Sequence, residues 1–276
     1  DAAAKPHRQA YDPVTGKFVT VYRPAATAAT PARPEKLTHP QGDDMGTITS
    51  RSVVQRITGA LRGVTATRLP GIDVSSHQGT INWGSVAPHV DFVYAKATEG
   101  TYYTNPDFGN QYNGSHDHGL VRGAYHFAIP NNSSGAAQAD FFVKHGGGWS
   151  AASKTLPGAL DIEYNPYGKE CYGLSRPAMT SWIRDFVDEY AFDTGVFPVI
   201  YTPAPWWKTC TGNATGFQAD PLWIPDYSST SPGTLPGGYL TYAIWQYAAA
   251  GPSEPEPGDQ DYFNGDYAAL LALAGG

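Results

Sequence analysis

Short apolar segments recur between residues 69 and 263, and polar stretches containing glycine or proline separate them. Apolar runs of four to eight residues that are bounded by turn residues are typical of buried strands. The pattern predicts eight strands, at residues 71–74, 91–97, 121–127, 159–164, 197–201, 222–227, 242–247 and 258–263. Eight strands with helices between several of them predict an α/β fold, namely an irregular (β/α) barrel of the TIM type with fewer than eight helices.

The clearest helix is predicted over residues 176–194. Ser175 can cap its first turn, Pro177 suits that turn, and Gly195 can end it. Apolar side chains recur with helical spacing along one stripe of this segment, at Met179, Trp182, Ile183, Phe186, Val187 and Tyr190. Shorter helices are expected at residues 105–119, at residues 134–146 and near the C-terminus. The connections after residues 201 and 227 show no such pattern, so loops are expected there.

Residues 1–69 differ from the rest of the chain. They are rich in Pro, Ala and Thr and contain few large apolar side chains, so they cannot bury enough surface to fold by themselves. We interpret them as a basic, mostly non-globular N-terminal arm, and residues 70–276 as the barrel domain. Within the arm, Tyr11–Tyr22 could form a hairpin and Ser50–Leu61 a short amphipathic helix. The arm is either a linker or processed pro-segment, or a segment that docks on the barrel or on an anionic polymer.

The charge of the chain is distributed unevenly. Residues 1–69 contain ten of the 18 Lys and Arg but five of the 25 Asp and Glu, so they carry a net charge of +5 and the remaining residues −12. An acidic body argues against a nucleic-acid partner. No apolar run reaches the length of a membrane span, so no membrane partner is expected. Aromatic residues make up 13% of the chain, which suits stacking on sugar rings better than binding phosphates.

The two cysteines, Cys171 and Cys210, form either a disulfide or two reduced thiols. Both lie in polar stretches and not in apolar core segments, which favours the disulfide and an oxidising compartment. The chain begins at Asp1 without a methionine or an apolar leader, as expected after removal of a signal peptide, although a chain trimmed in another way would begin in the same manner. We therefore expect an extracellular protein, and we expect it to be a monomer.

Asp161 and Glu163 lie two residues apart in the fourth predicted strand. Successive side chains of a strand alternate between its faces, so both carboxyls point the same way, with Cα atoms about 6.6 Å apart. Repulsion between the two charges favours a proton on one carboxyl near neutral pH. A proton donor beside an anion is the equipment for cleaving a glycosidic bond. The alternative is a strand end at which two acids face water, and for a D-x-E sequence by itself that alternative is the more common.

Active sites of such barrels gather at the C-terminal ends of the strands. The polar and aromatic residues expected at this rim are Asp73, Glu99, Tyr125, His126, Asp161, Glu163, Tyr201, Asp226, Trp245, Gln246 and Asp259. Carboxyls that transfer protons and rings that stack on sugars would together form a polysaccharide groove. A metal site at His116 and His118 is disfavoured, because side chains two apart on a helix diverge. We expect neither a metal nor a cofactor.

Seven segments of the chain resemble, in order, those of glycoside hydrolase family 25. They read GIDVSSHQGTINW, DFVYAKATEGTYYTNPDF, GAYHF, LDIE, WIPDY, WQY and DQDYFNGD. The resemblance spans about residues 70–263 and leaves out the arm. It implies a secreted, irregular β/α barrel with an acidic groove. It also implies a lysozyme (N-acetylmuramidase) that cleaves the β-1,4 linkage between N-acetylmuramic acid and N-acetylglucosamine in bacterial peptidoglycan, with retention at the anomeric carbon.

The positions within these motifs imply roles for four acids. Glu163 resembles the family's general acid/base and Asp161 its partner, whereas Asp73 and Asp259 resemble the other two active-site acids. Asp161 has two possible tasks. It could attack the anomeric carbon directly, which needs carboxyls about 5–5.5 Å apart, or it could orient the substrate's own N-acetyl group for that attack. We favour the second task, because peptidoglycan sugars carry 2-acetamido groups.

The last predicted strand leaves a choice between two aspartates. Gly258 stands where the family has an apolar residue, so either Asp259 or Asp261 could face the groove, and we favour Asp259. The candidate substrate-binding residues are Tyr125, Tyr201, Asp226, Trp245 and Glu99. The aromatic members of this set either cover the end of the hydrophobic core or contact the substrate, and the sequence does not favour one role over the other.

Two rival functions remain open. A chitinase-like hydrolase also ends a barrel strand in D-x-E, but such enzymes usually carry a further Asp two residues before the first acid, where this chain has Ala159. A catalytically silent module that binds cell walls is the second rival, and the presence of both Asp161 and Glu163 argues against it.

Overall fold

Eight strands form a closed barrel in the computed structural model, which describes residues 6–25, 68–151, 154–227, 230–251 and 254–275. In their order around the barrel they are β3 (Arg68–Val74), β4 (Phe92–Glu99), β6 (Val121–Phe127), β7 (Ala159–Asp161), β8 (Val199–Tyr201), β9 (Leu222–Pro225), β10 (Ile244–Ala248) and β11 (Asp259–Asn264). The pairing of β11 with β3 closes the ring. A short strand, β5 (Tyr103–Thr104), extends the sheet beside the end of β4. The predicted irregular α/β barrel is confirmed, and each predicted strand overlaps an observed one.

The barrel is mixed, because β11 runs antiparallel to both of its neighbours, β10 and β3. The other neighbouring strands of the barrel pair in parallel. Asp259, the first residue of β11, therefore pairs with Asp73 near the end of β3. The antiparallel direction brings the start of β11 to the rim at which the parallel strands end.

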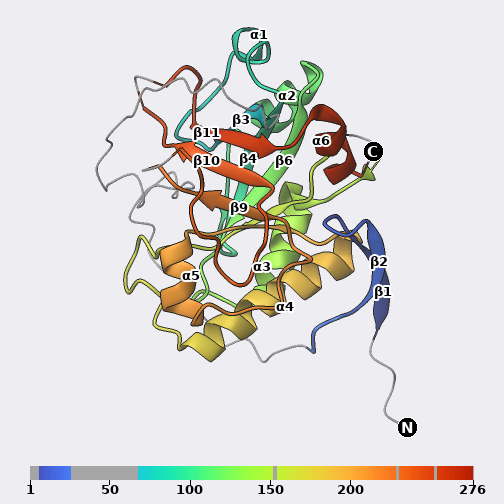
Figure 1. Ribbon diagram of the computed structural model, residues 1–276, viewed down its shortest axis with the longest axis vertical. Coiled ribbons are helices and arrows are strands. Elements are labelled where there is room, and N and C mark those ends of the chain that lie inside the picture. The colour runs from blue at the N-terminus through green and yellow to red at the C-terminus, as the bar shows by residue number, and fades with distance from the viewer. Residues whose placement is uncertain (1–5, 26–67, 152–153, 228–229, 252–253, 276) are drawn as a thin grey trace.

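The described residues contain six α-helices: α1 (Trp83–Val86), α2 (Gly114–Asp117), α3 (Gly135–Phe142), α4 (Arg176–Thr194), α5 (Ala204–Thr211) and α6 (Tyr267–Leu273). The π-helical turns η2 (Gly109–Asn113) and η3 (Val143–Gly147) adjoin α2 and α3. Figure 1 shows α3, α4 and α5 on one side of the barrel and α1 and α2 on the opposite side. None of these helices is both long and apolar enough to cross a membrane.

The predicted helix at residues 176–194 is confirmed as α4. The Ser175 side chain accepts a hydrogen bond from the backbone N–H of Ala178, and Gly195 ends the helix in the left-handed conformation with φ of 83°. Its predicted apolar stripe is buried against the barrel. The helix expected at residues 134–146 begins as α3 after Ser134, whose side chain accepts a hydrogen bond from the backbone N–H of Ala137.

The expectation of a loop after β8 is wrong, because α5 follows that strand. Trp206, Trp207 and Cys210 form the buried face of this helix, and Gly212 ends it in the left-handed conformation. Two helical turns are too short for their apolar spacing to stand out in the sequence. The described residues between β9 and β10 form no helix, in agreement with the loop expected there.

Cys171 and Cys210 form a disulfide, which confirms that prediction. The bond joins the loop after β7 to α5, with the two Cα atoms 5.3 Å apart. Contrary to the expected polar surroundings of both cysteines, Cys210 is buried in the core with only 1% of its surface exposed. The disulfide fixes the loop that begins at the D-x-E sequence against the helical side of the barrel.

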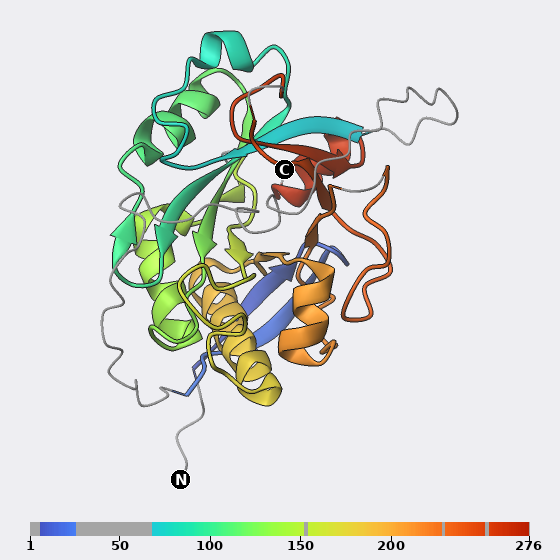
Figure 2. The same ribbon diagram turned by 90° about the vertical axis from the view of Figure 1, so that its left-hand side faces the viewer.

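Residues 6–25 of the arm are folded against the barrel. Strands β1 (His7–Asp12) and β2 (Lys17–Tyr22) pair antiparallel, as predicted for a hairpin. The hairpin lies beside α4 in both views (Figures 1 and 2). The Tyr11 backbone N–H donates to the Gly195 carbonyl at 2.7 Å, and the Arg8 guanidinium donates to the Asp193 carbonyl at 2.7 Å. The hairpin thus binds the C-terminal end of α4, whereas residues 1–5 and 26–67, including the helix expected at Ser50–Leu61, lie outside the described residues.

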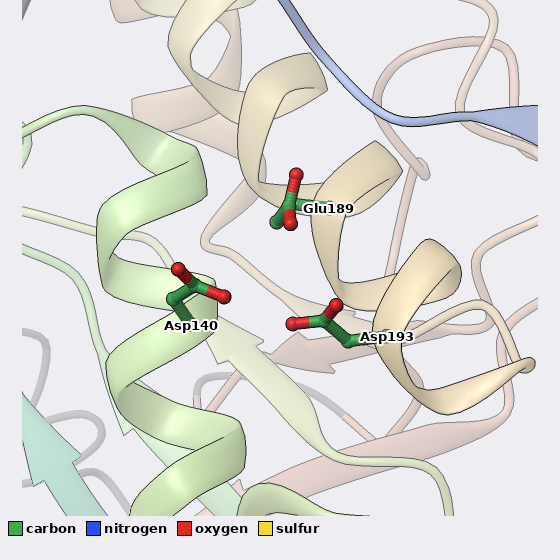
Figure 3. Close-up of side chains that lie close together, drawn as sticks. All are labelled: Asp140, Glu189 and Asp193. Atoms are coloured by element: carbon green, nitrogen blue, oxygen red, sulfur yellow. The ribbon is translucent and has the colours of Figure 1, made fainter. Parts of the chain in front are cut away.

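Arg23, directly after the hairpin, lies within a cluster of three carboxyls. Its Nη2 atom is 2.6 Å from Glu189 Oε1, 3.3 Å from Asp193 Oδ1 and 3.9 Å from Asp140 Oδ1. Figure 3 shows the three carboxyls converging from α3 and α4. By their spacing alone these carboxyls could hold a cation, but the guanidinium already supplies a matching positive charge. Part of the basic arm therefore docks on the acidic barrel.

We expect Arg23→Ala to destabilise the protein by about 1–2 kcal/mol, because Glu189 is 3% exposed and would lose its cation. The estimate is below that for a fully buried pair, since 44% of the Arg23 side chain is exposed. Chemical denaturation measures the change. The matched control is Lys144→Ala, since Lys144 pairs with Asp140 on the exposed surface at 3.6 Å and should cost less than about 0.5 kcal/mol. Equal losses in the two variants would contradict the role of Arg23.

The same cluster predicts a pH dependence of stability. Burial, the Asp140 hydrogen bond and the charges of Glu189 and Asp140 raise the pKa of Asp193 from 3.8 to about 6, although Arg23 opposes the shift. The folded state therefore binds the Asp193 proton more tightly than the unfolded state. Stability consequently falls as the pH rises from the unfolded pKa of 3.8 through the folded pKa of about 6. Denaturation of wild type and Asp193→Asn at several pH values should show the stability of the variant rising relative to wild type between about pH 4 and pH 7. A constant difference would contradict this assignment.

Candidate active site

The D-x-E sequence lies at the carboxyl-end rim of the barrel. Asp161 is the last residue of β7, and Glu163 lies two residues beyond it, so the strand is shorter than predicted. The Ile162 backbone N–H donates to the Tyr201 carbonyl at 3.0 Å, which keeps this segment extended beside β8. The Asp161 side chain is 0% exposed and that of Glu163 1% exposed. The alternative of a strand end with two acids facing water is therefore wrong.

The four predicted active-site acids lie around two tyrosines of this rim. These acids are Asp73, Asp161, Glu163 and Asp259. Burial is the main cause that raises the pKa of the Tyr201 and Tyr227 hydroxyls well above 10, and the nearby negative charges of the four acids raise it further. Both hydroxyls therefore keep their protons at neutral pH. The arrangement is a compact group of carboxyls with two neutral hydroxyls among them.

Gln246 links two of these acids to the two tyrosines. It lies on the inner face of β10 and is fully buried. Its Nε2 atom donates to Asp73 Oδ2 at 2.8 Å and to Asp259 Oδ2 at 3.0 Å. Its Oε1 atom accepts hydrogen bonds from the hydroxyl of Tyr201, at 2.8 Å, and from that of Tyr227. The sequence placed Gln246 at the rim but indicated no role for it.

Asp261 lies one layer deeper in the barrel than Asp259, two residues along the same strand. It is 0% exposed, and its Oδ1 atom accepts a hydrogen bond from Trp223 Nε1 at 2.9 Å. Burial and the charge of Asp259 raise the pKa of Asp261 well above 3.8, although hydrogen bonds with Trp223 and Asp73 oppose the shift. The rim position of Asp259 and the deep position of Asp261 favour Asp259 as the groove residue.

Residues 72–254 match the family model described as Glycosyl hydrolases family 25. The chain belongs to this family. It is 51% identical over 208 residues to Lysozyme M1 of Streptomyces globisporus, a match that covers 74% of this chain and 70% of that protein. It is 44% identical over 211 residues to the N,O-diacetylmuramidase of Chalaropsis sp, covering 75% of this chain and 99% of that protein.

A solved structure of a family 25 lysozyme from Aspergillus fumigatus has the same fold. It superposes with a TM-score of 0.73 at 49% sequence identity, and the match covers 76% of this chain and 100% of the fungal chain. The bacterial lysozyme from Streptomyces coelicolor superposes with a TM-score of 0.72, also at 49% identity, and covers 75% of this chain and 97% of that chain. The β1–β2 hairpin precedes the residues that match the family model.

Glu99, a predicted substrate-binding residue of this family 25 protein, is fully buried and paired within the protein. Its Oε2 atom lies 2.6 Å from Lys96 Nζ, and Lys96 is also fully buried. The hydroxyls of Tyr102 and Tyr167 both donate to Glu99 Oε1. Tyr167 belongs to the loop after Glu163, so Glu99 and Lys96 position that loop. Nothing in the sequence apart from the family motif that contains both residues indicated that Glu99 pairs with Lys96.

The remaining predicted substrate-binding residues occupy different layers. Tyr125 and Tyr201 are fully buried inside the barrel. Trp245 neighbours the inward-pointing Gln246 on β10, so its ring points to the outer face, where it lies 5.1 Å from the Arg68 guanidinium. Asp226 is half-buried just after β9 and accepts a hydrogen bond from Trp245 Nε1 through its carbonyl.

A cavity of about 290 Å³ opens at the ends of β7, β8 and β9. Tyr164, Pro203, Asp226 and Tyr227 are among the residues that line it. Tyr164 follows Glu163 directly, and Tyr227 is one of the two tyrosines held by Gln246. The cavity therefore adjoins the acid group through Tyr164 and Tyr227, and the predicted substrate-binding residue Asp226 is part of its lining.

His126, the histidine predicted at the rim, has structural partners. Burial lowers the pKa of His126 to about 4, so its ring is neutral at pH 7. Its Nδ1 atom lies 2.7 Å from Thr98 Oγ1 and its Nε2 atom 2.9 Å from Gln138 Oε1. His116 and His118 do not belong to any group of potential metal ligands in the described part of the chain.

Proposed function

We propose that this family 25 glycoside hydrolase is a lysozyme that cleaves the β-1,4 linkage between N-acetylmuramic acid and N-acetylglucosamine in bacterial peptidoglycan. The observation that carries the proposal is the group of four buried acids around Tyr201 and Tyr227 at one rim of the barrel. Relatives named as a lysozyme and an N,O-diacetylmuramidase, at 51% and 44% identity, support the choice of substrate.

Glu163 is the general acid/base in this proposal. Burial and neighbouring carboxylates both favour the neutral form of a carboxyl, so Glu163 can hold a proton near neutral pH. In the first step it gives this proton to the glycosidic oxygen while the bond from that oxygen to the anomeric carbon breaks. In the second step it takes a proton from the water that attacks the anomeric carbon.

Asp161 assists the first step by orienting the substrate's 2-acetamido group. Its carboxylate accepts a hydrogen bond from the amide N–H and turns the amide oxygen towards the anomeric carbon. That oxygen then forms a bond to the anomeric carbon as the leaving sugar departs, and Asp161 stabilises the positive charge that develops on the ring. Water later displaces the amide oxygen from the same face as the original bond, so the configuration is retained.

The substrate implies that the protein acts outside the cell that makes it. Peptidoglycan lies outside the cytoplasmic membrane, and the Cys171–Cys210 disulfide is stable in an oxidising compartment. Asp73 and Asp259 contribute negative charge next to the reacting sugar, and Tyr227 and Asp226 line the cavity into which the glycan would extend.

A paired assay on purified bacterial walls and on colloidal chitin tests the proposal. We expect the turbidity of the walls to fall and new reducing ends to appear, with little release of sugar from chitin. Cleavage of chitin without cleavage of walls would support the chitinase-like rival. Sedimentation of the protein with walls that stay intact would support the silent binding module.

A further inference from the structure

The orientation of the Gln246 amide is fixed by the chemistry of its four partners. Two of them, Asp73 Oδ2 and Asp259 Oδ2, are carboxylate oxygens that accept hydrogen bonds when ionised. The other two are the hydroxyls of Tyr201 and Tyr227, each with one proton to donate. With both aspartates ionised, only one orientation satisfies all four, with the NH₂ group towards the aspartates and Oε1 towards the tyrosines.

We propose that Gln246 is a positioning residue whose amide lowers the proton affinity of Asp73 and Asp259 and fixes both side chains in place beneath the substrate. This inference rests on the proposed function. Each hydrogen of the amide group goes to a different carboxylate, so one neutral side chain joins two strands, β3 and β11, across the inside of the barrel. Without these donors, both carboxyls would bind protons more tightly, because neighbouring acids disfavour each other's charged form.

The two tyrosines strengthen the donors. When Tyr201 and Tyr227 donate to Oε1 they polarise the amide, and a polarised amide donates more strongly through its N–H groups. The two hydroxyls also lie within hydrogen-bond reach of each other. Tyr227 lines the cavity, so the hydrogen bonds of Gln246 connect to the proposed substrate site.

The titratable groups around Gln246 come from five of the eight barrel strands. Asp73 lies on β3, Asp259 and Asp261 on β11, Asp161 at the end of β7 and Glu163 just after it, Tyr201 on β8, and Tyr227 after β9. Apart from the tyrosines all of these are acids, so a loss of the amide donors raises the proton affinity of the group as a whole. The acidic limb of the activity profile reports this change, because that limb reflects carboxyls that must be ionised.

The test measures kcat and KM on soluble peptidoglycan fragments from pH 3 to pH 8 for wild type, Gln246→Glu and Gln246→Met. We expect the acidic limb of kcat/KM to move up by about one pH unit in Gln246→Glu, which adds a carboxyl, and by less in Gln246→Met. We expect kcat to fall about a hundredfold in both variants, with KM changed by less than about threefold.

Gln138 provides the matched control. It is fully buried and makes four hydrogen bonds, to His126, to both backbone groups of Ile129 and to Ser133, but to no carboxyl. Gln138→Met should lower the unfolding temperature and leave the pH profile of the folded enzyme unchanged. If neither Gln246 variant folds, Tyr227→Phe gives the same test, because it removes one donor to Oε1 and should move the acidic limb in the same direction by a smaller amount.

An upward shift in the Gln246 variants, or in Tyr227→Phe, without a shift in Gln138→Met supports the proposal. Variants that lose activity or stability but keep the wild-type acidic limb overturn it, because Gln246 would then only support the fold. Variants with wild-type kcat and profile overturn it as well. A wild-type protein that does not cleave peptidoglycan overturns the proposed function itself, and this inference with it.

Discussion

Glu163→Gln is expected to lower the cleavage rate of bacterial walls by about a thousandfold while the protein stays folded. The amide cannot give a proton to the leaving oxygen, so departure of the sugar becomes the slow step. The fold should survive, because Gln has the shape of Glu and the change removes one negative charge from a group of buried acids. Turbidity loss and new reducing ends measure the activity, and thermal unfolding measures the stability.

Glu170→Gln is the matched control for this variant. Glu170 lies on the same loop, seven residues further along, and its side chain is exposed. The control should keep the wild-type rate. Turnover by Glu163→Gln within tenfold of wild type would show that another group is the acid.

Asp161→Asn should lower kcat by roughly a hundredfold to a thousandfold, because the neutral amide cannot stabilise the positive charge that develops on the sugar ring. Removing this carboxylate also removes the acceptor that orients the 2-acetamido group. The fall should appear in kcat more than in KM, since the charge exists only in the transition state. Rates measured on soluble glycan fragments of increasing concentration separate the two constants.

One control and one further measurement complete this test of Asp161. Asp117→Asn, a change at an exposed site on α2, should behave as wild type. Mass spectrometry of wild-type protein quenched during turnover should show no sugar attached to Asp161, because the substrate's own amide oxygen forms the intermediate. A covalent sugar adduct on Asp161 would replace this account with direct attack by the carboxylate.

The hydrophobic pattern predicted the barrel well, because each barrel strand is a short apolar run between turn residues. It also predicted α4 together with both of its caps, since the apolar stripe of this long helix continues from Met179 to Tyr190. It failed at α5, where Trp206, Trp207 and Cys210 fill only two turns. The pattern also could not predict that β11 runs antiparallel to its neighbours, because apolar alternation is the same in parallel and antiparallel strands.

The acids of the site could be named from motifs, but their connections could not. The hydrogen bonds of Gln246 join four residues that come from β3, β8, β11 and the segment after β9, and only the closed barrel brings them together. The docking of the arm is a similar case. The basic charge of residues 1–69 suggested a contact with the acidic barrel, whereas the specific contact of Arg23 with Glu189 depends on the register of the hairpin and the rotation of α4.

The central claim is that Glu163 and Asp161 act on the bond that follows N-acetylmuramic acid. Purified peptidoglycan is digested with wild type or with Glu163→Gln, the new reducing ends are reduced with borohydride, and the products are identified by mass spectrometry. The account predicts reduced N-acetylmuramic acid at the new ends with wild type, and almost no new ends with Glu163→Gln. Reduced N-acetylglucosamine at the new ends, or the same products and yields from both proteins, would contradict it.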